Sequence, residues 1–447
     1  MAINASRLGF MVDMGIRGTG TAQFDYADAS EQYLLPRPLI IYLKDDDRSM
    51  DHHQCLSCSN ATIVKYLTRF GAKSVVRLHR HEQLDPLLQR EGVTHLHILS
   101  GDIAPPLTSR LPTVVNLVHT VFDAKVASTA HVPNVLYARV SPSVATWKTQ
   151  RSIPVVPHIV RPAGTPPWTI EGPDLRSSLG IPQSATVFCR HGGPTSFNRE
   201  AAQHAVQKIA MMESNATARR IHFIFVNTLT GPWCRDVHGA HLSRVHILRS
   251  LPRDDLPSFI RSCDAMIHGR TSGEMFGLAL AEFAILHKPI FTSAPKGSTA
   301  DMHFRILGKR AIVYDSTPSL VAKLLSFDRD EARRRGAYWN AFRPFDPYSV
   351  MQSFSCVFLH GGTCNRTSLP GTAGWPRGEG EEQAQRLSRG GGATVDAGAA
   401  DGSMAADPCH TCSDYYTAFR RLSGDGKVGN SNPYAGVPEE SSTIDPL

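Results

Sequence analysis

The sequence lacks any long apolar run without charged residues. No uncharged apolar stretch of about 18 residues or more occurs, so we expect no transmembrane helix. Residues 1–10 also lack the apolar block of a signal peptide, and we therefore expect a cytoplasmic location. These absences leave a peripheral contact with a membrane open. Hydrophobic residues make up 41% of the 447-residue chain, which is enough to fill the cores of two domains.

The nine cysteines lack the regular spacing of a disulfide framework or a zinc site. Two pairs, Cys55 with Cys58 and Cys409 with Cys412, have the two-residue gap that zinc sites use. The pairs lie far apart in the chain, however, and no familiar spacing links them. We therefore predict no metal site and expect reduced thiols with a minor structural role.

Clusters of positive charge are also scarce, although the net charge is +7. Acidic residues outnumber basic ones from His360 onward, so the positive charge belongs to the part of the chain before it. The basic residues are mostly scattered, with one run of three at Arg333–Arg335, and aromatic residues are not interleaved with them as a stacking platform requires. A small anionic partner is therefore favoured over nucleic acid.

Short apolar segments alternate with helical patterns in two successive series. This rhythm favours parallel sheets covered by helices, in two similar α/β halves. The expected strands of the first half are 10–14, 38–43, 74–78, 95–100, 114–120 and 134–140, and those of the second are 186–189, 221–226, 245–248, 265–268, 289–292 and 311–314.

A proline-rich connector at 160–167 separates the two halves. We predict domains at residues 1–165 and 166–330, followed by a terminal helical segment at 331–359. From His360 the composition turns to glycine, alanine, serine and acidic residues, which cannot bury enough apolar surface to fold. We predict that residues 360–447 are disordered, with a short helix at 415–422.

The segment 268–292 carries the strongest chemical signal of the chain. An apolar strand runs through a glycine-rich loop into an apolar helix, and the backbone N–H groups of Phe276, Gly277 and Leu278 lie where such a helix begins. Unpaired N–H groups at a helix start bind phosphate. Glu274 and Glu282 bracket this point, and each carboxylate can accept hydrogen bonds from hydroxyl groups. An acidic face on a core helix is the alternative, but Glu282 lies among apolar residues and needs a partner.

These residues carry a family resemblance. Two glutamates separated by seven residues, with Phe276-Gly277 between them and Lys288-Pro-Ile290 after them, resemble the retaining GT-B glycosyltransferases of group 1, or family 4, which are related to sucrose and glycogen synthases. The resemblance implies two Rossmann-like domains that face a cleft, with the terminal segment returning to the first domain. It also implies a nucleoside diphosphate sugar as donor, no cofactor or metal, and an unidentified glycan, lipid or protein as acceptor.

The resemblance also assigns roles within the second half. Glu274 would contact sugar hydroxyls, Glu282 the ribose, and Phe276, Gly277 and Leu278 the diphosphate. Arg190 opens a glycine loop after a strand, where the family has a basic residue that neutralises the leaving group. Arg270 lies two residues beyond a strand end, which makes it a second candidate for this charge.

Two positions in the first half complete the predicted site. His119 stands at the end of an apolar strand, where the related enzymes often have a histidine that bonds to the transferred sugar. Gly18, with Arg17 and Thr19, belongs to a glycine loop that lies at the cleft in GT-B enzymes. The catalytic set is thus His119, Glu274 and Arg190.

One departure from the family keeps rival hypotheses open. The family often has a lysine about five residues beyond its first basic residue, and no lysine lies between Arg190 and Arg199. Either Arg199 or Arg270 substitutes for it, or the chain is divergent, or it has lost activity. A sugar-nucleotide-binding protein without catalysis and a GT-B-type sugar-nucleotide epimerase are the alternatives.

Overall fold

The structure is a computed structural model of the chain. It describes residues 7–12, 14, 18–34, 37–43, 56–100, 108–121, 134–142, 153–161, 175–249, 251, 255–294 and 300–361. Among the helices in these ranges, none is long and apolar enough to cross a membrane.

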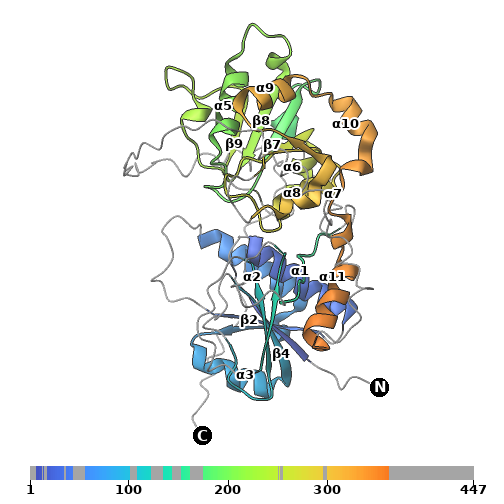
Figure 1. The fold of residues 1–447 in the computed structure, drawn as a ribbon. Coiled ribbons are helices and arrows are strands. Elements are labelled where there is room, and N and C mark those ends of the chain that lie inside the picture. The colour runs from blue at the N-terminus through green and yellow to red at the C-terminus, as the bar shows by residue number, and fades with distance from the viewer. Residues whose placement is uncertain are drawn as a thin grey trace, which may run out of the picture. The chain divides into compact units, whose positions relative to one another are not determined.

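The first half forms one six-stranded parallel sheet (Figure 1). Its strands are β1 (Arg7–Met11), β2 (Leu39–Leu43), β3 (Val75–Leu78), β4 (Val93–Ser100), β5 (Val115–Thr120) and β6 (Val135–Arg139), in the spatial order β3-β2-β1-β4-β5-β6. The helices of this half are α1 (Gly18–Tyr33), α2 (Leu56–Phe70) and α3 (Leu84–Arg90).

The second half repeats this plan with another six-stranded parallel sheet. Its strands are β7 (Thr186–Arg190), β8 (Ile221–Val226), β9 (Val245–Leu248), β10 (Ala265–Ile267), β11 (Ile290–Thr292) and β12 (Ala311–Val313), in the order β12-β11-β10-β7-β8-β9. Its helices are α4 (Leu175–Ser178), α5 (Glu200–Met211), α6 (Leu256–Arg261), α7 (Leu278–Ile285), α8 (Met302–Leu307) and α9 (Thr317–Leu325).

The same strand order in both sheets creates one topological switch point in each. Successive strands run outward from β1 and β4 in the first sheet, and from β7 and β10 in the second. Loops that leave the carboxyl ends of two such central strands diverge to opposite faces and leave a crevice where ligands bind. The loops after β1, β7 and β10 are therefore the places in this fold where a ligand site is expected.

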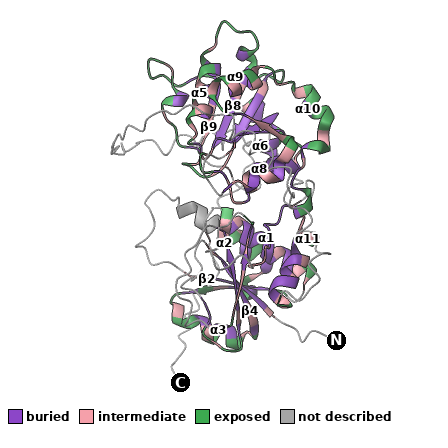
Figure 2. Cartoon of the chain, in the orientation of Figure 1, coloured by how far each residue is buried: buried purple, intermediate pink, exposed green. Residues whose placement is uncertain are grey.

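The central strands are buried because helices cover the sheets, as their apolar composition requires (Figure 2). Each strand that the sequence pattern predicts is present, but the first is displaced: it spans Arg7–Met11 instead of 10–14. Its beginning is set by pairing, since Arg7 lies opposite Val93 of β4. Gly18, predicted in a loop, is the first residue of α1.

The last part of the described chain is broken where one helix was expected. It contains α10 (Arg329–Arg335), α11 (Pro347–Phe354) and a π-helical turn at Ser355–Leu359. Pro344 and Pro347 interrupt the helical pattern, because proline lacks the N–H that a helix interior needs. Phe354 packs on Tyr26 of α1, with ring centroids 5.9 Å apart, so this segment contacts the first half.

The cysteines differ from the expectation of reduced thiols. Cys189, in β7, and Cys263, just before β10, form a disulfide with an S–S distance of 2.06 Å. Sequence spacing could not reveal the pair because 74 residues separate its members. The two cysteine pairs with zinc-like spacing lie outside the residues whose side chains the structure describes, as do 362–447 with the predicted tail helix.

Candidate functional site

The loops that leave β7 and β10 are joined to one another at the switch point of the second sheet. The N–H groups of Asn198 and Arg199 both donate to the carbonyl of Gly269, at 3.0 and 2.9 Å. The N–H of Thr271 donates to the Asn198 side chain at 2.9 Å. Gly269 permits this approach, since a Cβ there would lie 2.5 Å from the Phe197 ring. Residues on both loops are therefore held in a fixed relation.

Arg190 ends β7 and is almost completely buried. Its guanidinium donates to the Thr228 and Ser196 hydroxyls, both at 2.5 Å, and to the Gly193 carbonyl at 3.2 Å. Burial lowers the pKa of Arg190 to about 10, with Arg270 also lowering it and Glu274 opposing the shift. Arg190 is therefore a cation at neutral pH, and a charge with so little solvent around it acts more strongly than one in water.

Glu274 is brought beside this charge by the β10 loop. Its Oε2 accepts from Nη1 of Arg270 at 2.8 Å, and its Oε1 lies 3.5 Å from Nε2 of His268. Burial raises the pKa of the Glu274 carboxyl, but a hydrogen bond from His268 and electrostatic interactions with His268, Arg270 and His303 outweigh it and lower the pKa to about 2. Glu274 is ionised at neutral pH, so its carboxylate only accepts hydrogen bonds.

Helix α7 starts at Leu278, four residues after Glu274. Gly277 stands at the N-cap with φ of 90°, in the left-handed region, and no side chain caps the helix there. The first N–H groups of α7, beginning with Leu278, therefore have the orientation that binds an anion. The Phe276 side chain lies in the core against Phe342 and Phe345, so only its backbone could take part.

A histidine side chain lies beside the Glu282 carboxylate. Its Oε2 lies 3.1 Å from Nε2 of His191, the residue after Arg190. The His191 ring stacks on Phe283, with ring centroids 5.7 Å apart. A sequence reading could not find this pair, because the two residues lie 91 positions apart and meet only through the order of the strands.

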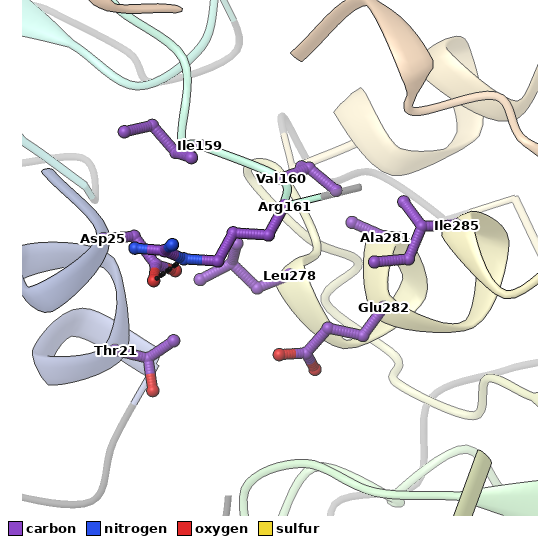
Figure 3. Close-up of a pocket in the computed structure, with 9 residues that line it drawn as sticks. All are labelled: Thr21, Asp25, Ile159, Val160, Arg161, Leu278, Ala281, Glu282 and Ile285. Carbon is purple, nitrogen blue, oxygen red and sulfur yellow. Dashed lines mark hydrogen bonds and ion pairs between the residues drawn. The ribbon is translucent and has the colours of Figure 1, made fainter. Parts of the chain in front are cut away.

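A small hollow of about 10 Å³ lies beside Glu282, with room for roughly one water molecule (Figure 3). The Glu282 side chain reaches toward it from α7, and Thr21 and Asp25 reach it from α1 (Figure 3). Nε of Arg161 donates to the Asp25 carboxylate at 2.8 Å. Gly18 comes near the same region, since a Cβ there would lie 3.8 Å from Cδ1 of Leu278. Arg17 lies outside the described residues.

His119 is not exposed at a crevice as the sequence suggested. It is fully buried, and Nε2 lies 2.7 Å from the Val156 carbonyl while Nδ1 lies 3.4 Å from Nε2 of His97. The reason is topological: β5 is one strand removed from the switch point, and the Phe358 ring packs against the His119 ring. In this arrangement His119 has no exposed atom with which to contact a sugar.

The site contains residues that sequence reasoning missed. His268 follows β10 directly, and this position at the end of a central strand was the available signal. Thr292 and His303 carried no comparable signal, because they come from the next strand and from α8. Arg199, a candidate for the missing lysine, has a buried Nε without a hydrogen-bond partner among the described residues.

Comparisons with known proteins bear on the fold. The sequence matches no protein-family model and no curated protein. Solved structures are similar: a glycosyltransferase from Rickettsia africae ESF-5 has a TM-score of 0.55 at 10% identity, over 81% of this chain and all of that one. Anabaena Alr3699/HepE in complex with UDP-glucose has a TM-score of 0.51 at 14% identity, over 78% and 99%. A putative UDP-N-acetylglucosamine 2-epimerase from Listeria monocytogenes has a TM-score of 0.51 at 11% identity, over 81% and 98%.

At these identities the similarity concerns the fold alone. The two Rossmann-like α/β domains, each with a six-stranded parallel sheet, have the GT-B architecture that the sequence predicted. The exact domain boundaries at 165 and 330 stay predictions.

Proposed function

We propose that this protein is a glycosyltransferase that moves a sugar from a nucleoside diphosphate sugar to an acceptor, with retention at the anomeric carbon and without a cofactor or metal. The observation that carries the proposal is that Arg270 holds the Glu274 carboxylate beside the uncapped start of α7, at the switch point of the second sheet, where Arg190 interacts electrostatically with both. The complex of Anabaena HepE with UDP-glucose, a protein of similar fold, supports a UDP-sugar as the first donor to try.

Each part of the site has a task in this reaction. The diphosphate would bind the N–H groups at the start of α7, where the helix dipole favours negative charge. Arg190 and Arg270 would stabilise the charge that grows on the leaving phosphate. Removal of one such hydrogen-bond donor typically lowers kcat by about 10²–10³-fold. Glu274 would accept hydrogen bonds from sugar hydroxyls and Glu282 from the ribose.

The proposed step needs no side-chain nucleophile. The bond from the anomeric carbon to the leaving phosphate oxygen breaks, and the acceptor oxygen bonds to the same face of that carbon. The acceptor proton passes to the leaving phosphate. The protein's part is to hold donor and acceptor together and to stabilise the charge.

Two observations keep other candidates in view. The fold is shared with a putative UDP-N-acetylglucosamine 2-epimerase, which favours epimerisation as the second candidate. The glycine loop after Arg190 has no lysine, which favours binding without turnover. All three functions use a nucleotide-sugar site and differ in the product.

The test is to incubate the full chain with UDP-, GDP- and ADP-sugars, with and without a panel of glycan, lipid and peptide acceptors. We expect nucleoside diphosphate release that depends on acceptor, and a glycosylated product with the donor's anomeric configuration by NMR. A change in the sugar of the donor without transfer would show an epimerase, and binding without either product would contradict the transferase.

The same assay tests the placement of the site. Glu282→Ala removes the carboxylate proposed for the ribose and should weaken nucleotide binding about tenfold or more, because a hydrogen bond to a charged group is lost. Glu331→Ala, on the exposed face of α10, is the matched control and should bind as the wild type does. Unchanged binding in Glu282→Ala would mean that the nucleotide lies elsewhere.

A further inference from the structure

A buried histidine, His268, lies beside the Glu274 carboxylate and has no role in the proposed transfer step. Nδ1 of His268 lies 2.9 Å from the Thr292 hydroxyl, at the end of β11. Its Nε2 lies 3.5 Å from Oε1 of Glu274, at the outer limit of a hydrogen bond, and has no closer partner among the described residues. Thr292 and His268 are almost completely buried, so water does not compete for the contact between the Thr292 hydroxyl and Nδ1 of His268.

The chemistry of the three groups decides where the protons are. An ionised Glu274 carboxylate can only accept, so Nε2 of His268 must carry a hydrogen. In the neutral imidazole Nδ1 then has a lone pair, and the Thr292 hydroxyl donates to it. The Glu274 carboxylate thereby selects the tautomer of His268 with a hydrogen on Nε2, and the Thr292 hydroxyl, which can donate or accept, holds the other ring nitrogen.

Two further contacts fix Glu274. Arg270 holds the second carboxylate oxygen at 2.8 Å, and Nδ1 of His303 accepts from the Glu274 backbone N–H at 3.2 Å. His303 is fully buried, and burial is the main cause that lowers its pKa to about 3, so it is neutral and free to accept. Oε1 of Glu274 thus contacts His268 and Oε2 contacts Arg270, and both oxygens keep lone pairs for a ligand.

We propose that His268 is a positioning residue which, oriented by Thr292, holds the Glu274 carboxylate in the direction that receives the hydroxyl groups of the transferred sugar. This inference rests on the proposed function, because it concerns the sugar that Glu274 would bind. It separates two parts of donor recognition. The contact orders only the Glu274 carboxylate, which accepts hydrogen bonds from the sugar. Its loss therefore weakens binding of the sugar nucleotide and leaves binding of the free nucleoside diphosphate unchanged.

The test compares two replacements of one ring. The amide of Gln reaches the place of Nε2, whereas the amide of Asn reaches the place of Nδ1. His268→Asn therefore keeps a partner for Thr292 and loses the donor to Glu274, and His268→Gln keeps that donor. We expect the preference for UDP-glucose over UDP, measured as the ratio of their Kd values by calorimetry, to fall about tenfold in His268→Asn and to stay near wild type in His268→Gln.

A second pair guards against a variant that fails to fold. Thr292→Val keeps the shape but removes the hydroxyl, and it should lower the same ratio, while Thr292→Ser should restore it. If the wild type prefers UDP-glucose and the ratios are unchanged in His268→Asn and Thr292→Val, the role of His268 is wrong, while the proposed function stands. A wild type that binds no sugar nucleotide of the UDP, GDP and ADP series would overturn the proposed function and, with it, this role.

Discussion

At the scale of single residues, Gly269 shows how one absent side chain builds the site. A Cβ at this position would lie 2.5 Å from Cε2 of Phe197 and 3.0 Å from Cβ of Ala202. The Phe197 ring cannot swing away easily, because it packs against Phe225 and Trp233 with ring centroids 4.9 and 5.2 Å away. The loops after β7 and β10 meet here only because no side chain fills this space.

We therefore predict that Gly269→Ala lowers the free energy of unfolding by about 2 kcal/mol, the usual cost of an overpacked core. Urea unfolding followed by fluorescence measures this loss. Gly193→Ala is the matched control in the partner loop: its Cβ would meet nothing closer than the Ser196 hydroxyl at 3.4 Å, so its stability should stay close to wild type. Equal stability of Gly269→Ala and wild type would show that the loops are not so tightly joined.

The environment of a single residue is the hardest property to predict from sequence. His119 was placed correctly on a strand, yet its exposure depended on which strand and which helix lay next to it. Arg190 was chosen for its position after a strand and Glu274 for its place before the helix start in the two-glutamate pattern, and the loops that carry them leave the two central strands β7 and β10. Position along a strand is local information, whereas burial is set by packing from distant segments.

At the scale of elements, α7 joins the loop with Glu274 to the predicted phosphate site. Its boundaries, Leu278–Ile285, follow closely the apolar pattern from Leu278 to Leu286. Helix propensity and the glycine before Leu278 are local properties, so the sequence predicted this element well. The broken segment after α9 was predicted less well, because a helical pattern with two prolines was taken as one element.

Gly277, the N-cap of α7, has a left-handed backbone conformation that favours glycine. Alanine at φ of 90° costs about 1–2 kcal/mol, and its Cβ would also lie 3.1 Å from Cδ1 of Leu280. We expect Gly277→Ala to be less stable by this amount and to bind UDP several-fold more weakly, because the N–H groups at the helix start are displaced. Thermal unfolding and calorimetry measure the two effects.

Gly239→Ala separates the two effects. Gly239 also has a left-handed φ, of 83°, but a Cβ there would meet no atom within 4 Å, and it lies in the β8–β9 connection. This variant should lose a similar stability and keep its affinity for UDP. If Gly277→Ala keeps full affinity as well, the start of α7 is not the phosphate site.

At the scale of the whole molecule, the Cys189–Cys263 disulfide crosslinks the two strands of the switch point. Cys189 precedes Arg190, and Cys263 precedes Asp264, whose carboxylate accepts from Arg176 and from the Val187 N–H. The bridge closes a loop with a sequence separation of 74 residues. Such a loop gives about 4 kcal/mol in the chain-entropy model, because the crosslink restricts the unfolded chain.

We predict that reduction lowers the free energy of unfolding of the wild type by about 4 kcal/mol more than it lowers that of the double variant Cys189→Ser/Cys263→Ser. Denaturant unfolding of both proteins, with and without a phosphine reductant, gives this difference. Any effect that remains in the double variant belongs to another disulfide, since Cys356 is also disulfide-bonded. The same reductant effect in both proteins would contradict a bridge between Cys189 and Cys263.

The sequence by itself determined the order and type of the elements and the position of the motif from His268 to Thr292. These depend on apolar periodicity, glycines and prolines, which act over a few residues. Only the tertiary structure decided that β10 lies beside β7, and hence that Arg190 interacts electrostatically with Glu274, His191 lies against Glu282 and Cys189 is bonded to Cys263. Strand order is the outcome of long crossovers and shared burial, and no local pattern encodes it.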